Sequence, residues 1–303
     1  MFRKIKKNSN VFIISNDAGG AECLYRISKD LDCKKKYYLD GPAKKIFKKK
    51  KSINKKFINK NILNSDYLIC STSFTDKIYY KAIQLAKSYN IYTIVVLDHW
   101  TFYKERLKKS RNDKIPDEVI VLDNYANKKV KKLFPKLKIT RLPNLYMNEL
   151  VLKIGRINKK NNKVGKNILY CSEVIENIPT IKKPFYDFSY YKYDEFEALN
   201  YFFENIDKLY DRINQITLRE HPTEKKYKYK NIINKFKNKF EIIQSKNETL
   251  LNQIKNSDVI VGCETYPMAI ASIAGKDVFS SVPPGGKKIS IPFKNIKYLR
   301  DLI

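Results

Sequence analysis

Short apolar runs alternate along the chain with longer segments in which apolar residues recur every three or four positions. Such runs are typical of buried strands, and the longer spacing is typical of amphipathic helices. In the first half the runs predict strands at 11–14, 37–39, 67–70, 92–97, 119–122 and 139–142. The spacing predicts helices at 20–31, 76–89 and 124–133, with a Lys-rich helix or loop at 43–60. Because strands that alternate with helices build parallel sheets, we expect an α/β fold.

The same pattern restarts after residue 166. It predicts strands at 167–171, 216–218, 240–243, 259–261 and 278–280, and helices at 195–213, 229–240, 249–255 and 266–274. Residues 153–166 lack apolar content and periodicity, which predicts a linker. The sequence therefore predicts two tandem Rossmann-like, doubly wound domains, 1–152 and 167–303, that face an interdomain cleft. Ligands are expected at the carboxyl ends of both sheets.

Charge is the most unusual feature of the composition. The chain has 61 Lys and Arg against 31 Asp and Glu, a formal net charge of +30. Only nine of the basic residues are Arg, and Lys occurs in every segment. A dedicated nucleic-acid surface more often uses Arg in a localised stripe. We attribute the excess to composition and expect no specific nucleic-acid partner. An anionic substrate or membrane surface remains an alternative, as does nucleic acid.

The cysteines and the N-terminus limit the compartment and the class of protein. The five Cys are odd in number and form no CxxC pair, so neither a disulfide framework nor a zinc site is expected. The apolar run near the N-terminus is too short for a signal peptide, and no apolar stretch is long enough to cross a bilayer. We expect a cytoplasmic protein, with peripheral contact at the anionic inner membrane face as an option.

A polar loop with two glycines follows the first predicted strand. Asn16 and Asp17 precede Gly19 and Gly20, and Glu22 follows them. Glycine allows close approach of the backbone to a ligand, and a helix N-terminus offers N–H groups. The loop is neither GxGxxG nor a P-loop, which disfavours dinucleotide binding and nucleotide hydrolysis. It is a candidate ligand-facing loop; the alternative is a tight turn in which Asp17 begins the helix.

Asp98 and His99 follow the most apolar predicted strand of the first half. A carboxylate beside an imidazole at a strand end can accept a proton near neutral pH, as general-base catalysis requires. The alternative is that His99 is a structural hydrogen-bonding residue and that the neighbouring Trp100 packs in the core.

Three segments of the second half could bind an anion. Arg219 and His221 follow one strand, and Pro222 fixes the loop that carries them. A strand–turn–helix junction carries Gly262, Glu264 and Thr265, where N–H groups and the Thr hydroxyl could hold a phosphate and Glu264 could accept bonds from ribose hydroxyls. Capping of a helix by Thr265 is the alternative. Ser281 begins a basic, Gly-rich loop that is either a cover over an anionic ligand or an exposed turn.

These features together resemble GT-B glycosyltransferases. The resemblance rests on the tandem domains, the Gly-containing first loop, His221-Pro222, and a Gly262-x-x-Thr265 helix start followed by Ala-Gly-Lys-Asp-Val. The bacterial capsule and lipopolysaccharide transferases, which include His-Pro sialyltransferases and CDP-glycerol glycerophosphotransferases, are the most similar group. Asp17-Ala18-Gly19 only partly matches the acidic pair and Gly of the sialyltransferases, and Glu264-Thr265 replaces their paired Ser/Thr, so the donor sugar stays open.

The resemblance implies transfer of a sugar from a nucleotide-activated donor to a cell-surface glycan or lipid-linked acceptor, with the nucleotide sugar as substrate and no cofactor. His221 would contact the donor phosphate. The expected catalytic residues are Asp17 as base, Asp98 or His99 as alternative bases, and His221 with Arg219 at the leaving group. The expected donor-binding residues are Arg219, His221, Gly262, Glu264, Thr265 and Ser281. The expected acceptor-binding residues are Asn16, Gly19, Gly20 and Glu22.

No metal is expected, because GT-B leaving groups are generally held by protein donors. Two rival functions share some of these features. A sugar-nucleotide epimerase of the UDP-N-acetylglucosamine 2-epimerase type has the same tandem architecture. A non-catalytic protein could instead bind nucleic acid or another anion through its Lys excess.

Overall fold

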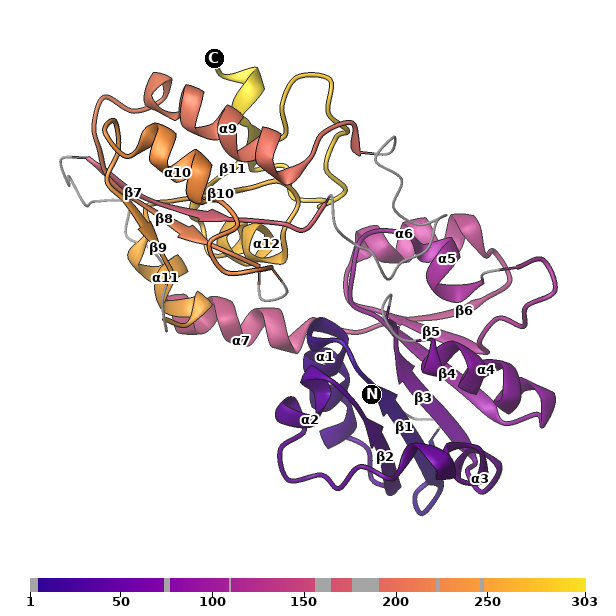
Figure 1. The fold of residues 1–303 in the computed structure, drawn as a ribbon. Helices are drawn as coiled ribbons and strands as arrows, with labels where there is room; N and C mark the ends of the chain where they lie inside the picture. Colours follow the sequence, from indigo (N-terminus) through magenta and orange to yellow (C-terminus); the bar gives the residue numbers. More distant parts are fainter. Residues whose placement is uncertain are drawn as a thin grey trace. The chain divides into compact units, whose positions relative to one another are not determined.

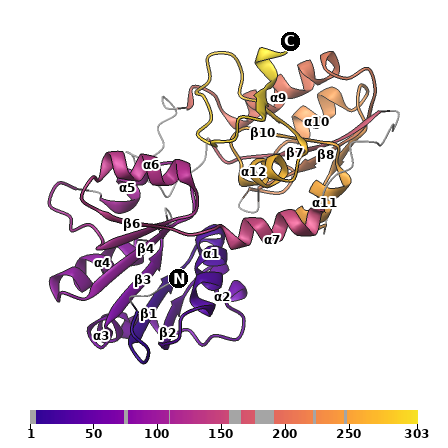
Figure 2. The ribbon, with the colours of Figure 1, turned by 180° about the vertical axis from the view of Figure 1, so that it is seen from behind.

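The computed structural model describes residues 5–73, 77–108, 110–155, 165–175, 191–221, 224–245 and 248–303 of the chain. The chain divides into two compact units, Met1–Tyr146 and Met147–Ile303. Each unit contains one six-stranded sheet, and Figures 1 and 2 show helices on both faces of each sheet. The α/β architecture of two Rossmann-like domains that the sequence predicts is confirmed.

The first sheet is wholly parallel, with the strand order β2-β1-β3-β4-β5-β6. Every strand that the apolar runs predict in this half is present. Their bounds are β1 Asn10–Ser15, β2 Lys34–Leu39, β3 Tyr67–Ser71, β4 Tyr92–Leu97, β5 Glu118–Val121 and β6 Lys138–Arg141. The order reverses between β1 and β3, because β2 lies on one side of β1 and all later strands lie on the other.

The helices of this half include the three that the spacing predicts. The helices are α1 Ala18–Lys29, α2 Pro42–Ile46, the 3-10 helix η1 Lys55–Phe57, α3 Ile58–Leu63, α4 Ile78–Ser88, α5 Tyr103–Leu107 and α6 Asn124–Leu133. Asp76, where the sequence placed the start of α4, lies outside the described residues. The short helix α5 was not expected, nor was α7 (Leu145–Ile154), in which the boundary between the units falls.

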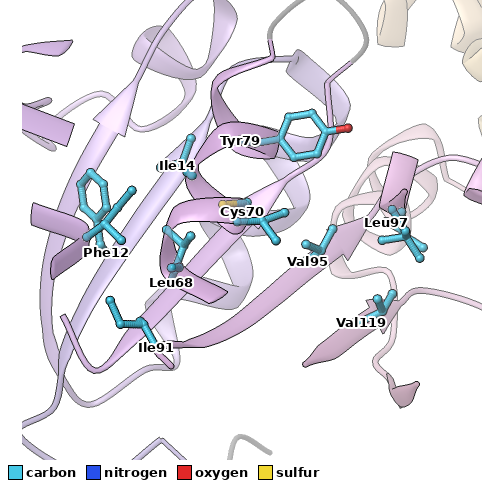
Figure 3. Packing of buried hydrophobic residues seen from close by; sticks show 14 of the residues in the cluster. Phe12, Ile14, Leu68, Cys70, Tyr79, Ile91, Val95, Leu97 and Val119 are labelled. Carbon is cyan, nitrogen blue, oxygen red and sulfur yellow. The ribbon is translucent and has the colours of Figure 1, made fainter. Parts of the chain in front are cut away.

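Side chains of the first sheet alternate between two cores. Phe12 and Ile14 of β1 pack on the face that α3, α4 and α6 cover, as Figure 3 shows for part of that core. Val11 and Ile13 pack on the opposite face, which α1 and α2 cover. Successive residues of a strand point to opposite faces, so a strand covered on both sides is apolar throughout. That requirement explains the uninterrupted apolar runs of the sequence.

The second sheet is also parallel and has the strand order β12-β11-β10-β7-β8-β9. Its strands are β7 Lys166–Cys171, β8 Ile213–Arg219, β9 Ile242–Gln244, β10 Val259–Gly262, β11 Asp277–Ser280 and β12 Ile296–Tyr298. The order reverses between β7 and β10. Of these strands, only β12 was not expected from the sequence. Most of the predicted linker 153–166 lies outside the described residues.

The helices of the second unit are α9 Glu195–Asn205, the 3-10 helix η2 Ile206–Lys208, α10 Lys230–Phe236, α11 Leu250–Asn256, α12 Tyr266–Ile273 and the 3-10 helix η3 Leu299–Asp301. A capping box between Asp194 and Glu197 begins α9. The predicted helix 195–213 was too long, because Ile213 already belongs to β8. β-branched residues such as Ile213 and Ile216 fit the pleated surface of a strand.

Aromatic side chains fill the core of the second unit on one face of its sheet. Phe202 and Phe203 of α9 are fully buried there. The ring of Phe202 lies 4.9 Å from that of Tyr170 and 5.1 Å from that of Phe203, measured between centroids. No helix in the described part of the chain is long and apolar enough to cross a membrane.

We expect Phe202→Ala to lower the free energy of unfolding by about 3–5 kcal/mol, because the change removes a buried ring and leaves a cavity. Urea denaturation followed by circular dichroism measures this loss. Tyr227→Ala is the matched control, since Tyr227 is 62% exposed and its truncation should change the free energy by no more than about 0.5 kcal/mol. Equal effects of the two substitutions would contradict the placement of Phe202.

Candidate functional site

The reversals of strand order mark where each sheet can bind a ligand. In an open parallel sheet the loops after the two strands at a reversal leave toward opposite faces, so a crevice opens at the carboxyl edge. In the first sheet this point lies between β1 and β3, and in the second between β7 and β10. Each unit therefore has one candidate site, described below by itself.

Asp17 and Ser73 meet at the reversal in the first sheet. Ser73 follows β3, and its Oγ donates to Asp17 Oδ1 at 2.8 Å. Beneath them, the hydroxyls of Ser15 and Ser71 lie 2.8 Å apart and are buried. Asp17 occupies the cap position of α1, yet its side chain caps no backbone N–H of that helix. The Asp17 carboxylate thus faces across the crevice to the loop after β3.

A second carboxylate, Asp98, lies deeper in the same edge. Arg106 of α5 is 5% exposed and donates from Nη1 to Thr72 Oγ1 at 2.8 Å. Thr72 Oγ1 in turn donates weakly to Asp98 Oδ1, at 3.4 Å. Burial raises the pKa of Asp98, the charge of Arg106 opposes that rise, and Asp17 adds to it. The two carboxylates of this site therefore have different environments.

Gly19 and Gly20 let α1 approach these groups. A Cβ on Gly19 would lie 2.6 Å from Asp98 Oδ2, and one on Gly20 would lie 2.7 Å from the Cβ of Ser71. Both distances are far below van der Waals contact, so a larger residue at Gly20 would clash with the start of the Ser71 side chain, and one at Gly19 would displace the Asp98 carboxylate. The two glycines serve close packing of the helix start against β3 and Asp98.

His99 and Trp100 are held by neighbours of their own. His99 Nδ1 lies 2.9 Å from Thr101 Oγ1. Burial, assisted by the charge of Arg106, lowers the pKa of His99 to about 3, so the ring is a neutral and weak base at physiological pH. Trp100 is buried and donates from Nε1 to Asp123 Oδ2 at 2.7 Å. This arrangement matches the structural alternative for both residues.

Asn16 and Glu22, expected to bind the acceptor, are engaged elsewhere. The backbone oxygen of Asn16 accepts from Ala43 N at 3.0 Å, and its side chain lies against Gly41. Glu22 forms an ion pair with Arg26 one turn later on α1, at 2.5 Å. Of the predicted residues in this unit, the structure thus brings Asp17, Asp98, Gly19 and Gly20 together.

In the second unit, Glu224 fixes the loop that carries His221. Its carboxylate accepts from the backbone N–H of His221 at 2.7 Å, from Tyr229 OH at 2.5 Å and from Ser172 Oγ. Lys228 donates to Glu224 at 3.1 Å and also pairs with Glu195. These donors lower the pKa of Glu224 against the effect of burial. His221 is an exposed residue, yet partial burial of its ring lowers the pKa of the imidazole, an effect that the charge of Glu224 opposes. Pro222 lies outside the described residues.

Glu173 and Glu264 meet at the reversal between β7 and β10. Glu264 N donates to Glu173 Oε2 at 2.9 Å, and Glu264 Oε1 accepts from Ser290 N at 2.5 Å. Burial, and next the charge of Glu264, raises the pKa of Glu173 to about 8. Burial likewise raises the pKa of Glu264 to about 7. Burial thus favours the protonated form of both carboxyls more than in an exposed Glu, and a protonated carboxyl can both donate and accept hydrogen bonds.

The other predicted donor-binding residues have structural partners or lie in the interior. Arg219 donates from Nη1 to Glu248 O at 3.0 Å and to Gln253 Oε1 at 2.6 Å, which ties β8 to the start of α11. Ser281 is fully buried, 3.1 Å from Tyr170 OH. Gly262 packs against Cys171 O. Thr265 is the N-cap residue of α12, but its side chain caps no backbone N–H of that helix. Its Oγ1 is buried and has no hydrogen-bond partner among the described residues.

Five site residues escaped the sequence analysis: Thr72, Ser73, Arg106, Glu173 and Glu224. One signal could have found three of them. The polar residues after the strands at 67–70 and 167–171 were readable as strand-end loops, and these include Thr72, Ser73 and Glu173. The described residues contain no group of three or more His, Cys, Asp or Glu that could hold a metal ion.

Solved structures of an epimerase and of a glycosyltransferase have the same fold. UDP-GlcNAc 2-epimerase from Neisseria meningitidis, bound to UDP-GlcNAc, matches with a TM-score of 0.55 and 10% identity over 89% of this chain and 82% of that one. S. aureus MnaA with UDP matches with 0.56 and 10% over 90% and 78%. A glycosyltransferase from Rickettsia africae matches with 0.56 and 13% over 91% and 79%.

No protein-family model matches the sequence, and a comparison with curated proteins finds no match. At 10–13% identity the structural likeness establishes the fold alone. It supports the GT-B-type architecture of two Rossmann-like domains, which glycosyltransferases and UDP-GlcNAc 2-epimerases share.

We expect the stability of this protein to fall, relative to Glu173→Gln, as the pH rises from about 5 to about 8. The pKa of Glu173 is raised from 4.5 to about 8 in the folded state. Glu173 therefore releases its proton at lower pH in the unfolded chain than in the folded protein. The contribution of its protonated form to the free energy of unfolding is fully present below pH 4.5 and is lost as the pH approaches 8. Each pKa unit between the folded and the unfolded state corresponds to about 1.4 kcal/mol of unfolding free energy, before solvent screening reduces it.

Urea unfolding of both proteins across this pH range measures the effect. Glu241→Gln serves as the control, because Glu241 is exposed and its replacement should leave the pH profile of the wild type unchanged. Parallel profiles for the wild type and Glu173→Gln would show that Glu173 is ionised in the folded protein near neutral pH.

Proposed function

We propose that this chain is a nucleotide-sugar-dependent glycosyltransferase that modifies a cell-surface glycan or a lipid-linked acceptor. The observation that carries the proposal is that carboxyl groups gather at the carboxyl edge of each sheet, Asp17 and Asp98 beside the start of α1 and Glu173 and Glu264 at the reversal in the second sheet. Similar folds that hold UDP-GlcNAc or UDP support a nucleotide-sugar substrate. The rickettsial glycosyltransferase supports the transferase class.

In this proposal Asp17 is the general base. Its carboxylate is partly buried and accepts from Ser73 Oγ at 2.8 Å, whereas burial raises the pKa of the Asp98 carboxyl. Asp17 accepts the proton of the acceptor hydroxyl as the oxygen attacks the anomeric carbon of the donor, and the bond from that carbon to the nucleotide phosphate breaks. Asp98 then supplies fixed negative charge, or a hydrogen bond when it is protonated.

The second unit binds the donor in this proposal. Glu173 and Glu264 bind a polyhydroxyl group such as ribose, since a protonated carboxyl can donate to one hydroxyl and accept from another. His221 donates an N–H to the phosphate that leaves, and the Glu224 network holds its loop in place. Arg219 keeps a positioning role, because its guanidinium already binds Glu248 and Gln253.

An epimerase is the second candidate, because one of the similar solved structures is a UDP-GlcNAc 2-epimerase bound to UDP-GlcNAc. The two reactions differ in their need for an acceptor. Formation of an epimer from UDP-GlcNAc without any acceptor would identify an epimerase, whereas turnover that requires an acceptor would identify a transferase.

A nucleotide should raise the melting temperature of the protein. We expect one of CMP, CDP, UDP and GDP to do so, since a ligand that binds only the folded state stabilises it by about 2.7 kcal/mol at 100 times its Kd. Differential scanning fluorimetry measures the shift. No shift with any of the four at millimolar concentration would contradict both the transferase and the epimerase.

Asp17→Asn and His221→Ala should each lower kcat by about 10²–10⁴-fold, with melting temperatures close to that of the wild type, because one removes the base and the other a donor to the leaving group. The assay follows release of the nucleotide identified by the melting experiment. Glu22→Gln is the matched control, because the Glu22 carboxylate already pairs with Arg26 one turn along α1, and it should retain nearly full turnover. Full activity of either site variant would remove that residue from the mechanism.

A further inference from the structure

The connection from β2 to β3 is strongly basic. Residues 42–63, here called the Lys-rich connection, contain nine Lys and neither Asp nor Glu. The nine are Lys44, Lys45, Lys48, Lys49, Lys50, Lys51, Lys55, Lys56 and Lys60, and all are exposed. It includes α2, η1 and α3 and follows β2, the strand at the edge of the first sheet (Figure 1).

The charge of the Lys-rich connection is not compensated within the first unit. Lys44 pairs with Asp40 at 2.7 Å, and the other eight Lys form no ion pair among the described residues. Buried or half-buried Lys elsewhere do have partners, as Lys87 has in Asp117 and Lys228 has in Glu195. Clustered like charges repel one another and destabilise a compact state. Binding of an anionic partner to the eight unpaired lysines relieves this repulsion and is therefore favourable.

Two apolar side chains lie exposed within the same charged segment. Ile58 and Ile62 anchor α3 in the core of the first unit. Phe57, just before α3, is 47% exposed, and Leu63, at its end, is 45% exposed. The ammonium of Lys56 lies 5.0 Å from the centre of the Phe57 ring. Exposed apolar groups among lysines are the combination by which peripheral proteins enter the headgroup layer of a membrane.

We propose that the Lys-rich connection docks the first unit on an anionic phospholipid bilayer. The bilayer offers many mobile negative charges that attract nearby Lys, and an interfacial layer that accepts Phe57 and Leu63. A nucleic acid fits less well, because the segment contains no Arg for bidentate contacts. The docking depends only on this surface and holds whether or not the protein transfers a sugar.

Co-sedimentation of the full chain with vesicles tests the proposal. We expect binding to vesicles of phosphatidylglycerol mixed with phosphatidylcholine at physiological salt, and little binding to phosphatidylcholine alone. Replacing Lys48, Lys49, Lys50 and Lys51 together by Gln should lower the partition coefficient by about 10- to 1000-fold. Phe57→Ser should weaken the binding that persists at high salt, where apolar contact outlasts electrostatic attraction.

A matched control separates this surface from the charge of the whole chain. Replacing four exposed, unpaired lysines of the second unit by Gln changes the net charge by the same amount; these are Lys237, Lys255, Lys294 and Lys297. The control should bind vesicles nearly as well as the wild type. An equal loss in both quadruple variants would overturn the proposal, because it would assign binding to overall charge. Displacement from vesicles by duplex DNA at a lower concentration than that of lipid would overturn it in favour of a nucleic-acid partner.

Discussion

The reversal of strand order is the constraint on which both candidate sites depend. Loops after β1 and β3, and after β7 and β10, must leave toward opposite faces of their sheets, which frees the carboxyl edge for a ligand. Asp17 and Ser73 stand at the first reversal, and Glu173 and Glu264 stand at the second. Close packing at the first reversal depends on Gly20. A Cβ at this position would lie 2.7 Å from the Cβ of Ser71, so a larger residue could not let α1 pack as closely against the end of β3.

The buried carboxyl groups of this chain have two kinds of partner, although the net charge is +30. Some have a cation, as Glu224 and Glu195 have in Lys228, and such pairs hold a loop in one position. Glu173 and Glu264 instead accept bonds from backbone N–H groups, and burial raises their pKa into the neutral range. A neighbouring cation keeps a carboxylate ionised. A buried carboxyl that has no cation partner stays protonated to higher pH, and its proton can be donated in a hydrogen bond to a ligand. The lysines that carry the net charge remain at the surface.

The sequence indicated Asp17, Asp98 and the loop of His221 because each follows an apolar run, and such runs end at the edge where ligands bind. It did not indicate Arg106, Glu173 or Glu224, because the roles of these residues come from distant partners. Arg106 binds Thr72, which lies 34 residues away, Glu224 binds Ser172 from 52 residues away, and Glu173 accepts from Glu264 across 91 residues. The assignment of Ser281 and Glu22 to ligands rested on position alone, and their partners point to structural roles.

The sequence by itself determined the strands and helices, because the period of apolar residues reports how each segment meets a core. It also determined that both sheets are parallel and which polar residues follow each strand. The tertiary structure decided where α9 ends and the order of the strands. It also decided which groups surround each carboxyl, such as Arg106 near Asp98 and Lys228 beside Glu224. These features depend on groups far apart in the chain, and a pKa is set by whatever burial and charge the fold places around the group.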